Sequence, residues 1–565
     1  MFFIFSSADN IMQGIDLVPA LGNVGFKSVV NGPTIWTGDG LPRIGRTKIP
    51  GYFDFNSLTY GIAQSLALSE YLVHVMLDGE QPADFDASDS FDPLRYSKWA
   101  SDEYANEKIT ETYTHNNKVV YGQYENRSAG KTTLAPHQYP LHHTLQNHGG
   151  VFGGVGASGI EVPMYYNSNK EHNTDPDVFA SNVQTHHDFE WSGIVAKEGN
   201  HVVAHCGLSY ASFSKIRVKG AKARELLESM TTAILPKKPS IDYPCKLTYG
   251  VTQKGRMCTE MTICRNSEQD WYLVGNRDRA EMDVVWLKER AVALFGEGNN
   301  NDNNDNNDNN DNNDNNDNND NNDMAIAIED ASEKTCVLHI CGPNSPALLS
   351  SIETRANKDL KFMTSRVVSD FGNVPGLDVQ IFRVSFSGLQ GYELHCSSDK
   401  STELFHLIHN SDAANINNMI LFGSVALNGL RIEQGFKIGA DMNLAHYKEG
   451  AIEPFVAKKR QFIGRDDAFV PEKRCVLLRI DTEKGWEWSV LGDTPICRKS
   501  DGQVVGFISS SAYGIQTQST MAIGYLMENG GKDNDEEALV VQGFGFEWDC
   551  TVLAQPPVEM MGRVD

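Results

Sequence analysis

Long apolar runs are missing from this chain. No stretch approaches the roughly eighteen consecutive apolar residues that a bilayer-spanning helix needs. The opening Met1–Ser7 segment is too short for a secretory signal peptide and contains none of the arginines typical of a transit peptide. We therefore expect no membrane insertion, and no targeting signal is visible at this N-terminus.

Paired cysteines and an excess of positive charge are also missing. The ten cysteines include no Cys-x-x-Cys motif and no regular spacing, which favours a reducing compartment and argues against zinc-ribbon chemistry. The 49 lysines and arginines face 74 aspartates and glutamates, for a formal net charge of −25. Eight of the aspartates lie in one repetitive tract, but the rest of the chain is still acidic, which argues against a nucleic-acid partner.

The 565 residues are enough for three or four domains, each with its own core. Apolar residues at helical spacing predict helices over 60–76 and 221–230, and Gly342–Leu349 begins a further helix with proline in its first turn. Gly38-Asp39-Gly40 is expected to close a hairpin. From residue 473 onward, short strands separated by turn residues predict a small all-β barrel.

Two segments carry carboxylates in apolar surroundings. The pattern of Val384–Leu394 predicts a strand, a glycine turn at Gly388 and Gly391, and a second strand that carries Glu393. Glycine at both turn positions indicates a close approach of the backbone to another group. In the second segment, helical spacing places Glu433 in the middle of an apolar stripe, where an ionised carboxylate needs a partner. Together the two carboxylates predict a ligand site.

Two histidine groups and one acidic tract have residues that can bind metals. No carboxylate follows His142 and His143 at a ligand spacing, so we expect a surface or interdomain position for this pair. His186 and Glu190 would share a helix face, but we expect no metal there either. The Asn-Asn-Asp repeat over 299–323 lacks the glycine and glutamate of an EF-hand loop and is predicted to be a disordered surface insertion.

Motifs along the whole chain resemble the dimethylglycine and sarcosine dehydrogenase family. Asn31–Gly45 followed by Tyr60–Gln64 looks like the last part of that family's FAD-binding domain. The motifs Phe91–Trp99, Glu111–Tyr113 and Tyr139–Gly153 occur in the order of its connecting module. The resemblance implies that FAD serves the complete family members. Because no GxGxxG fingerprint precedes residue 31, we expect that this chain does not bind FAD by itself.

The rest of the chain is similar to the glycine-cleavage T-protein group. Phe213–Gly220 resembles part of the folate-binding domain, and Gln503–Gly506 followed by Ala512–Gly514 resembles the C-terminal barrel. The resemblance implies an α+β multidomain fold with four parts: a truncated FAD-oxidoreductase remnant (1–92), a connecting module (93–155), a folate-binding aminomethyltransferase-like domain (156–465) and a C-terminal β-barrel (466–565). The Asn/Asp tract would be an insertion in the third part.

The same resemblance implies roles for five residues. Glu393 occupies the position of the carboxylate that grips the pterin of tetrahydrofolate, because one carboxylate accepts two parallel N–H bonds. Tyr392 and Phe386 stand at the family's aromatic and tyrosine positions beside it, and Arg431 lies on the helix that backs the folate cavity. Glu260 matches the catalytic carboxylate, which orients or deprotonates the attacking folate nitrogen.

Structural interpretations of these positions stay open. Glu393 is also compatible with a solvent-facing strand edge, and Glu260 with an exposed strand residue, since strand side chains alternate between faces. Tyr392 could equally be core packing. For Arg431 and Glu433 we favour a structural role, because an arginine partner most simply explains a buried carboxylate.

Two positions depart from the family pattern. Leu389 stands where the family has glutamate, and Phe386 lacks the usual tyrosine hydroxyl. The pocket is therefore expected to have one strong folate contact, at Glu393, and two weakened ones.

The leading interpretation is an enzyme of one-carbon metabolism that is similar to dimethylglycine dehydrogenase. The resemblance implies transfer of a one-carbon unit from an N-methylglycine-derived iminium to tetrahydrofolate, in the mitochondrial matrix. The expected partners are these small molecules, with no metal, nucleic acid or membrane. Two alternatives remain: a non-catalytic protein similar to the pyruvate dehydrogenase phosphatase regulatory subunit, and a stand-alone folate-dependent aminomethyltransferase.

Overall fold

The computed structural model describes most of the chain outside a few segments. The described residues are 15, 18–25, 35–58, 61–82, 91–96, 100–117, 138–155, 160–167, 192–237, 242–296, 326–442, 445–483, 487–488, 490–528, 538–543 and 545–558. The predicted Asn/Asp insertion and the His186 to Glu190 segment lie outside these residues. Within them, no helix is both long and apolar enough to cross a membrane.

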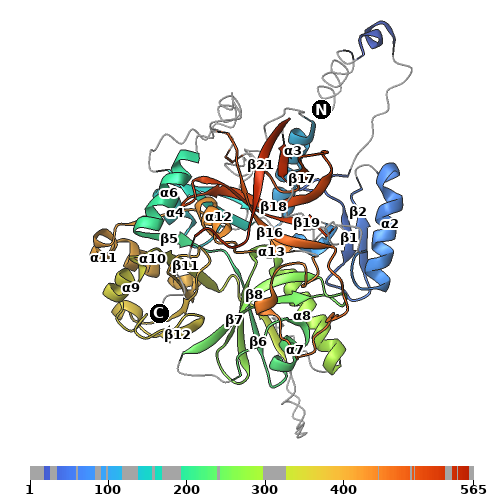
Figure 1. Ribbon diagram of the computed structural model, residues 1–565. Coiled ribbons are helices and arrows are strands. Elements are labelled where there is room, and N and C mark those ends of the chain that lie inside the picture. The colour runs from blue at the N-terminus through green and yellow to red at the C-terminus, as the bar shows by residue number, and fades with distance from the viewer. Residues whose placement is uncertain are drawn as a thin grey trace.

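The first unit is a hairpin with one helix packed on it. Strands β1 (Arg43–Arg46) and β2 (Phe53–Asn56) are antiparallel, and α2 (Gly61–Leu77) covers them at the outer edge of the molecule (Figure 1). The predicted helix is therefore confirmed, because its buried apolar residues pack against Ile44 of β1.

The prediction that Gly38-Asp39-Gly40 closes a hairpin is wrong. The turn between β1 and β2 lies at residues 47–52. Asp39 instead accepts a hydrogen bond of 2.7 Å from Nε of Arg95, which is buried. The tight turn therefore positions Asp39 to bind Arg95, which lies 56 residues away in the chain, and does not join a local pair of strands.

The connecting segments contain α3 (Asp102–Asn117), α4 (His142–Asn147) and the antiparallel strands β3 (Gly150–Val155) and β4 (Ile160–Tyr166). The predicted domain boundary between residues 155 and 156 falls inside the β3–β4 hairpin. Residues 150–155 therefore pair with residues 160–166, across that boundary.

An eleven-stranded sheet forms the centre of the molecule, in the order β10-β6-β9-β8-β7-β12-β13-β14-β11-β5-β15. All neighbours are antiparallel except β15 and β5. The strands are β5 (Cys206–Tyr210), β6 (Ser214–Lys219), β7 (Tyr243–Val251), β8 (Met257–Arg265), β9 (Asp270–Gly275), β10 (Ala327–Asp330), β11 (Thr335–Cys341), β12 (Thr364–Val368), β13 (Val379–Arg383), β14 (Gly391–Ser397) and β15 (Met419–Leu421).

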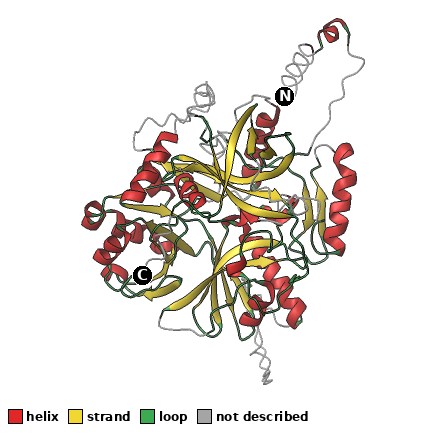
Figure 2. Cartoon of the chain, in the orientation of Figure 1, coloured by secondary structure: helices red, strands yellow, loops and turns green. Residues whose placement is uncertain are grey.

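Helices flank the strands of this sheet (Figure 2). They are α6 (Ser192–Ala204), α7 (Ala223–Met230), α8 (Ala280–Phe295), α9 (Ser345–Ile352), α10 (Ser401–His409), α11 (Asp412–Ile416), α12 (Ser424–Glu433) and α13 (Gly439–Met442). The predicted helices at 221–230 and after Gly342 are confirmed as α7 and α9. The apolar face of α7 is fully buried, as its periodicity predicted.

The C-terminal residues form a closed six-stranded barrel, in the order β16-β19-β18-β17-β20-β21. Its strands are β16 (Lys473–Ile480), β17 (Pro495–Arg498), β18 (Val504–Gly514), β19 (Ser519–Met527), β20 (Leu539–Gly543) and β21 (Phe546–Leu553). Helices α12 and α13 contact the barrel strand β18, and α13 also contacts β8 of the sheet (Figure 1). The predicted barrel is confirmed, and the chain is a multidomain α+β protein.

Candidate functional site

The loop between β13 and β14, residues 384–390, holds the predicted glycine turn. Gly388 has φ of +79°, in the left-handed region where glycine is favoured, and a side-chain carbon there would clash with Cγ of Gln434. The prediction of a close backbone approach is thus confirmed at Gly388. Leu389, at the position where the family pattern has glutamate, is buried in an apolar cluster with Phe422 and Leu430.

Glu393 lies on β14 and is 7% exposed, so it is not a solvent-facing strand edge. Its Oε2 is 3.3 Å from Nε2 of His395, and Nδ1 of His395 is 3.0 Å from the hydroxyl of Tyr272. Burial lowers the pKa of His395 and raises that of Tyr272. A neutral His395 then accepts from the Tyr272 hydroxyl and donates from Nε2 to Glu393.

The other oxygen of Glu393, Oε1, accepts no hydrogen bond from the described part of the chain. His339 on β11 is directly opposite Glu393 in the antiparallel register. Burial lowers the pKa of His339, although the neighbouring Glu393 opposes this shift. Glu393 is therefore flanked by two neutral imidazoles, with one oxygen fixed and one available to a ligand.

Tyr392 lies on the face of β14 opposite Glu393, because successive strand residues point to opposite sides of a sheet. It is 3% exposed and packs in the apolar core that includes Leu394 and Phe405. The expectation that Tyr392 contacts the same ligand as Glu393 does not agree with this placement. Its position corresponds to the core-packing interpretation.

Glu260 lies on β8, opposite Tyr249 of β7, and is partly buried. Burial raises the pKa of its carboxyl to about 8, an effect that the Arg431 guanidinium and a hydrogen bond from the Gly439 N–H partly offset. A carboxyl with this pKa exchanges protons near neutral pH, as a general acid or base requires.

Arg431 and Glu433 each have a partner from another part of the chain. Arg431, 1% exposed, forms an ion pair of 2.5 Å with the buried Asp441 and donates to the Phe436 carbonyl oxygen. Glu433 instead accepts hydrogen bonds from Gln516, through its backbone N–H at 2.9 Å and its side-chain Nε2 at 3.1 Å. The expected arginine partner for Glu433 is therefore wrong.

Two serines of the barrel complete the Arg431 ion pair. Ser509 donates to Oδ1 of Asp441 at 2.8 Å, and Ser510 donates to the same oxygen. Nη2 of Arg431 also donates to the Ser510 hydroxyl at 3.1 Å. These contacts give Arg431 a structural role, so the predicted cofactor contact at this residue is not supported by its geometry.

Phe386 belongs to an aromatic trio, defined as Phe213, Phe386 and Phe436. The ring centroid of Phe386 is 5.3 Å from that of Phe436 and 6.1 Å from that of Phe213. The trio brings together the 384–390 loop, the end of α12 and the residue that precedes β6. Phe386 is thus part of the loop that leads to Glu393.

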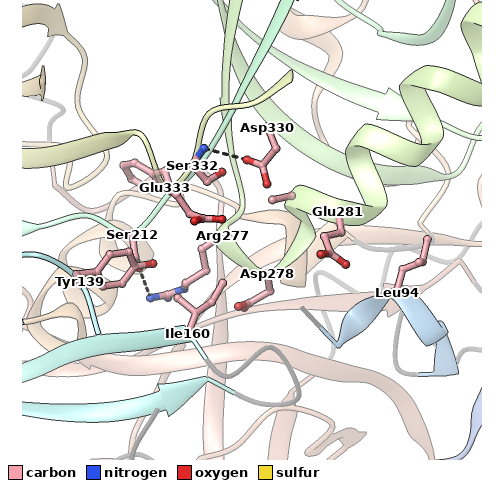
Figure 3. A pocket seen from close by; sticks show the side chains of 12 residues that line it. Leu94, Tyr139, Ile160, Ser212, Arg277, Asp278, Glu281, Asp330, Ser332 and Glu333 are labelled. Atoms are coloured by element: carbon pink, nitrogen blue, oxygen red, sulfur yellow. Dashed lines mark hydrogen bonds between the residues drawn. The ribbon is translucent and has the colours of Figure 1, made fainter. Parts of the chain in front are cut away.

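Phe213 also lines a pocket (Figure 3). Its lining contains four carboxylates and one guanidinium. Nη1 of Arg277 donates to the Ser212 hydroxyl at 3.0 Å, which fixes the guanidinium at the pocket wall. The sequence interpretation did not identify this pocket, because its lining comes from segments far apart in the chain. The lining residues are Leu94, Tyr139, Ile160, Ser212, Phe213, Arg277, Asp278, Ala280, Glu281, Asp330, Ser332 and Glu333.

Of the two positions predicted for His142, surface or interdomain, the structure excludes the surface one. The His142 side chain is buried on α4, and Nδ1 is 2.6 Å from Oε2 of Glu161 on the neighbouring β4. Burial raises the pKa of Glu161 to about 7 and lowers that of His142. His143 is exposed, as expected. Over the ranges that the structure describes, no group of three or more potential ligands is placed to hold a metal ion.

Gln434 was not identified from the sequence. It is 5% exposed, and both atoms of its side-chain amide are buried without a hydrogen-bond partner in the described structure. Nε2 of His339 is buried without a partner in the same way. A buried polar group without a partner costs about 1–3 kcal/mol, so such groups point to a function at the site.

Residues 141–451 match the model of the GCVT N-terminal domain family. This match covers more than half of the chain. The chain belongs to the GCVT N-terminal domain family. Over 98% of its length it is 24% identical to mitochondrial dimethylglycine dehydrogenase of Mus musculus. Over 92% it is 25% identical to mitochondrial sarcosine dehydrogenase of the same organism. The predicted resemblance is thus confirmed.

A solved relative supports the fold of this GCVT-domain protein. The crystal structure of glycine cleavage system aminomethyltransferase T from Bartonella henselae superposes with a TM-score of 0.56 and 20% sequence identity. It covers 74% of this chain and 98% of that one. The chain spans 58% and 56% of the two dehydrogenases, respectively.

Proposed function

We propose that this chain transfers a one-carbon unit from an N-methylglycine-derived iminium to tetrahydrofolate, giving 5,10-methylenetetrahydrofolate. The observation that carries this proposal is the state of Glu393. It is a buried carboxylate with one oxygen fixed by His395 and the other without a protein partner. The relatives are dehydrogenases of N-methylated glycines and an aminomethyltransferase, which agrees with this reaction class.

The residues present are suited to a reduced pterin. Glu393 would accept N–H bonds from the pterin edge, because a carboxylate is a strong acceptor for two parallel donors. The aromatic trio at Phe386 offers an apolar, flat-sided contact for a heterocycle. The His395 donor limits the rotation of the Glu393 carboxylate before the ligand arrives.

Glu260 would act on the reacting folate nitrogen. As this nitrogen forms its bond to the iminium carbon, it loses a proton, and the carboxylate of Glu260 accepts that proton. Glu260 would return the proton to the glycine nitrogen as the bond between that nitrogen and the one-carbon unit breaks, so that the amine leaves. The second folate nitrogen then bonds to the same carbon and releases its own proton to water. The pKa of about 8 makes Glu260 a stronger base than an ordinary glutamate once it is ionised. Arg431 and Asp441 would hold the neighbouring backbone at Gly439, whose N–H donates to Glu260.

The pocket of Figure 3 would receive the one-carbon donor. An N-methylglycine-derived iminium has a cationic nitrogen and a carboxylate, and the lining of this pocket offers four carboxylates to the first and the Arg277 guanidinium to the second. Phe213 contacts both the pocket and Phe386, so the two regions share a wall.

We propose that the N-terminal residues correspond to part of the FAD-binding domain of the two dehydrogenases. In the described residues before Pro93, β1, β2 and α2 form a hairpin with a helix, without a parallel β-α-β unit that would bind a dinucleotide. We therefore assign no flavin chemistry to these residues. By similarity to the two mitochondrial dehydrogenases, the proposed location is the mitochondrial matrix.

Calorimetric titration with tetrahydrofolate tests the proposal. The wild-type chain should bind, and Glu393→Gln should weaken binding by roughly 10- to 100-fold, since a hydrogen bond to a charged group contributes about 1.5–3 kcal/mol. Glu403→Gln is the matched control, because Glu403 is exposed on α10 and pairs only with Lys400. If the wild-type chain binds no tetrahydrofolate, the proposal fails and the non-catalytic, regulatory alternative is favoured.

A further inference from the structure

The two glycines at the ends of the Gly388–Gly391 segment each face a buried polar side chain. Gly388 lies against Gln434, with Oε1 at 3.0 Å from the position that a side-chain carbon at Gly388 would take. Gly391 lies against His339, with Nε2 at 3.2 Å from the corresponding position. The backbone here is therefore held close to two polar groups from different elements, α12 and β11.

Neither polar group has a partner among the residues that the structure describes. This is true of both amide atoms of Gln434 and of Nε2 of His339. The two side chains are 5% and 2% exposed, respectively. Methionine in place of the glutamine, or phenylalanine in place of the histidine, would fill similar volumes without unpaired polar atoms. Packing alone therefore does not explain these two residue types.

Glu393 is connected to both groups through the strand register and the chain. His339 is directly opposite Glu393 in the β11–β14 register, and Gly388 precedes Glu393 by five residues along the same segment. A ligand that pairs with the available oxygen of Glu393 thus has His339 on the same face of the sheet, and Gln434 lies against the loop that leads to this strand. Phe386, in the same loop, packs against Phe436, which follows Gln434 by two residues.

We propose that Gln434 and His339 contact the heterocycle bound at Glu393 and select it by its donor–acceptor edge. This inference rests on the proposed folate function and adds a determinant of specificity to it. A carboxamide presents one acceptor and two donors side by side. It therefore matches a lactam edge, in which an N–H donor adjoins a carbonyl acceptor, through two parallel hydrogen bonds. A neutral imidazole adds one directional bond from the facing strand.

Two isosteric substitutions test this in the full chain. Gln434→Met and His339→Phe should each weaken tetrahydrofolate binding about tenfold, the equivalent of one neutral hydrogen bond. At the same time neither variant should melt at a lower temperature without ligand, because each loses an unpartnered buried polar group. Loss of affinity together with unchanged or higher stability is the signature that a structural role would not give.

Gln81→Met is the matched control. Gln81 is 6% exposed, and both of its amide atoms are also buried without a partner, but its carbonyl oxygen contacts Arg256, away from the loop. The control should bind tetrahydrofolate as the wild type does. A second ligand, 4-amino-4-deoxy-tetrahydrofolate, changes only the lactam edge. The wild type should prefer tetrahydrofolate, and Gln434→Met should lose most of that preference.

The outcomes separate the two proposals. If the wild type binds tetrahydrofolate and both variants bind it within twofold of the wild type, this inference is overturned while the proposed function stands. An equal loss of affinity for both ligands in Gln434→Met overturns the assignment to the lactam edge. If the wild type binds neither ligand, the proposed function fails and this inference fails with it.

Discussion

Replacing Glu260 with glutamine removes the proton acceptor of the proposed transfer while it preserves the shape of the side chain. Glutamine can still accept the hydrogen bond from the Gly439 N–H, so the backbone around α13 should keep its position. The substitution also removes a carboxyl whose ionised form is disfavoured by burial. The variant should therefore fold at least as well as the wild type, and its defect should be chemical.

The pKa of Glu260 sets how strongly the transfer rate should depend on pH. A base acts only when it is ionised, and the pKa of Glu260 is about 8. About one eleventh of the protein then carries the active carboxylate at pH 7 and about ten elevenths at pH 9, so the transfer rate should rise about tenfold between these values. Glu260→Gln should lower the rate by about 10²- to 10⁴-fold and abolish this rise.

Single-turnover formation of 5,10-methylenetetrahydrofolate, followed at several pH values with saturating tetrahydrofolate, measures both effects. Glu403→Gln serves again as the control and should keep the wild-type profile, because Glu403 is exposed on α10. A wild-type rate that does not change between pH 7 and pH 9 would refute the reasoning. So would a Glu260→Gln variant that keeps the rise.

Two further substitutions test the groups that support the site. Asp441→Asn leaves the Arg431 guanidinium buried without a carboxylate and should lower the free energy of unfolding in urea by about 3–5 kcal/mol, whereas a loss below about 1 kcal/mol would contradict the ion-pair assignment. Tyr272→Phe removes the hydroxyl that fixes the His395 tautomer and should weaken tetrahydrofolate binding several-fold, by about 1 kcal/mol, with an unchanged fold by circular dichroism. Affinity equal to the wild type would argue against a role for the hydrogen bonds that join Tyr272, His395 and Glu393.

The regular elements could be predicted from local patterns, because periodicity reports burial directly. Helices α2, α7 and α9 follow from apolar residues at helical spacing and a proline in the first turn, and the barrel follows from repeated turn residues between short strands. The Gly38-Asp39-Gly40 turn misled the prediction. Its residues suit a hairpin, but Arg95, which binds Asp39, is distant in the sequence.

The site could be predicted only in part. Arg431 and Glu433 are two residues apart on a helix and so point in different directions, and a single helix does not reveal what each of them contacts. Their true partners, Asp441 and Gln516, lie on other elements. Strand alternation was sufficient to separate Tyr392 from Glu393.

Gln434 gave no signal at all in the sequence. A single glutamine after a helix is most simply a surface residue, and neither its burial nor its lack of a partner can be known before the loop around Gly388 is in place.

The hydroxyls of Ser509 and Ser510 have a consequence for how this chain can change over evolution. They belong to the barrel, yet they bind the Asp441 carboxylate that holds Arg431 beside the proposed catalytic glutamate. A barrel exchanged for one from a distant relative would need to bring a matching pair of hydroxyls, or the buried charges would lose two of their ligands. The barrel and the sheet are thus expected to be inherited together and to unfold as one cooperative unit.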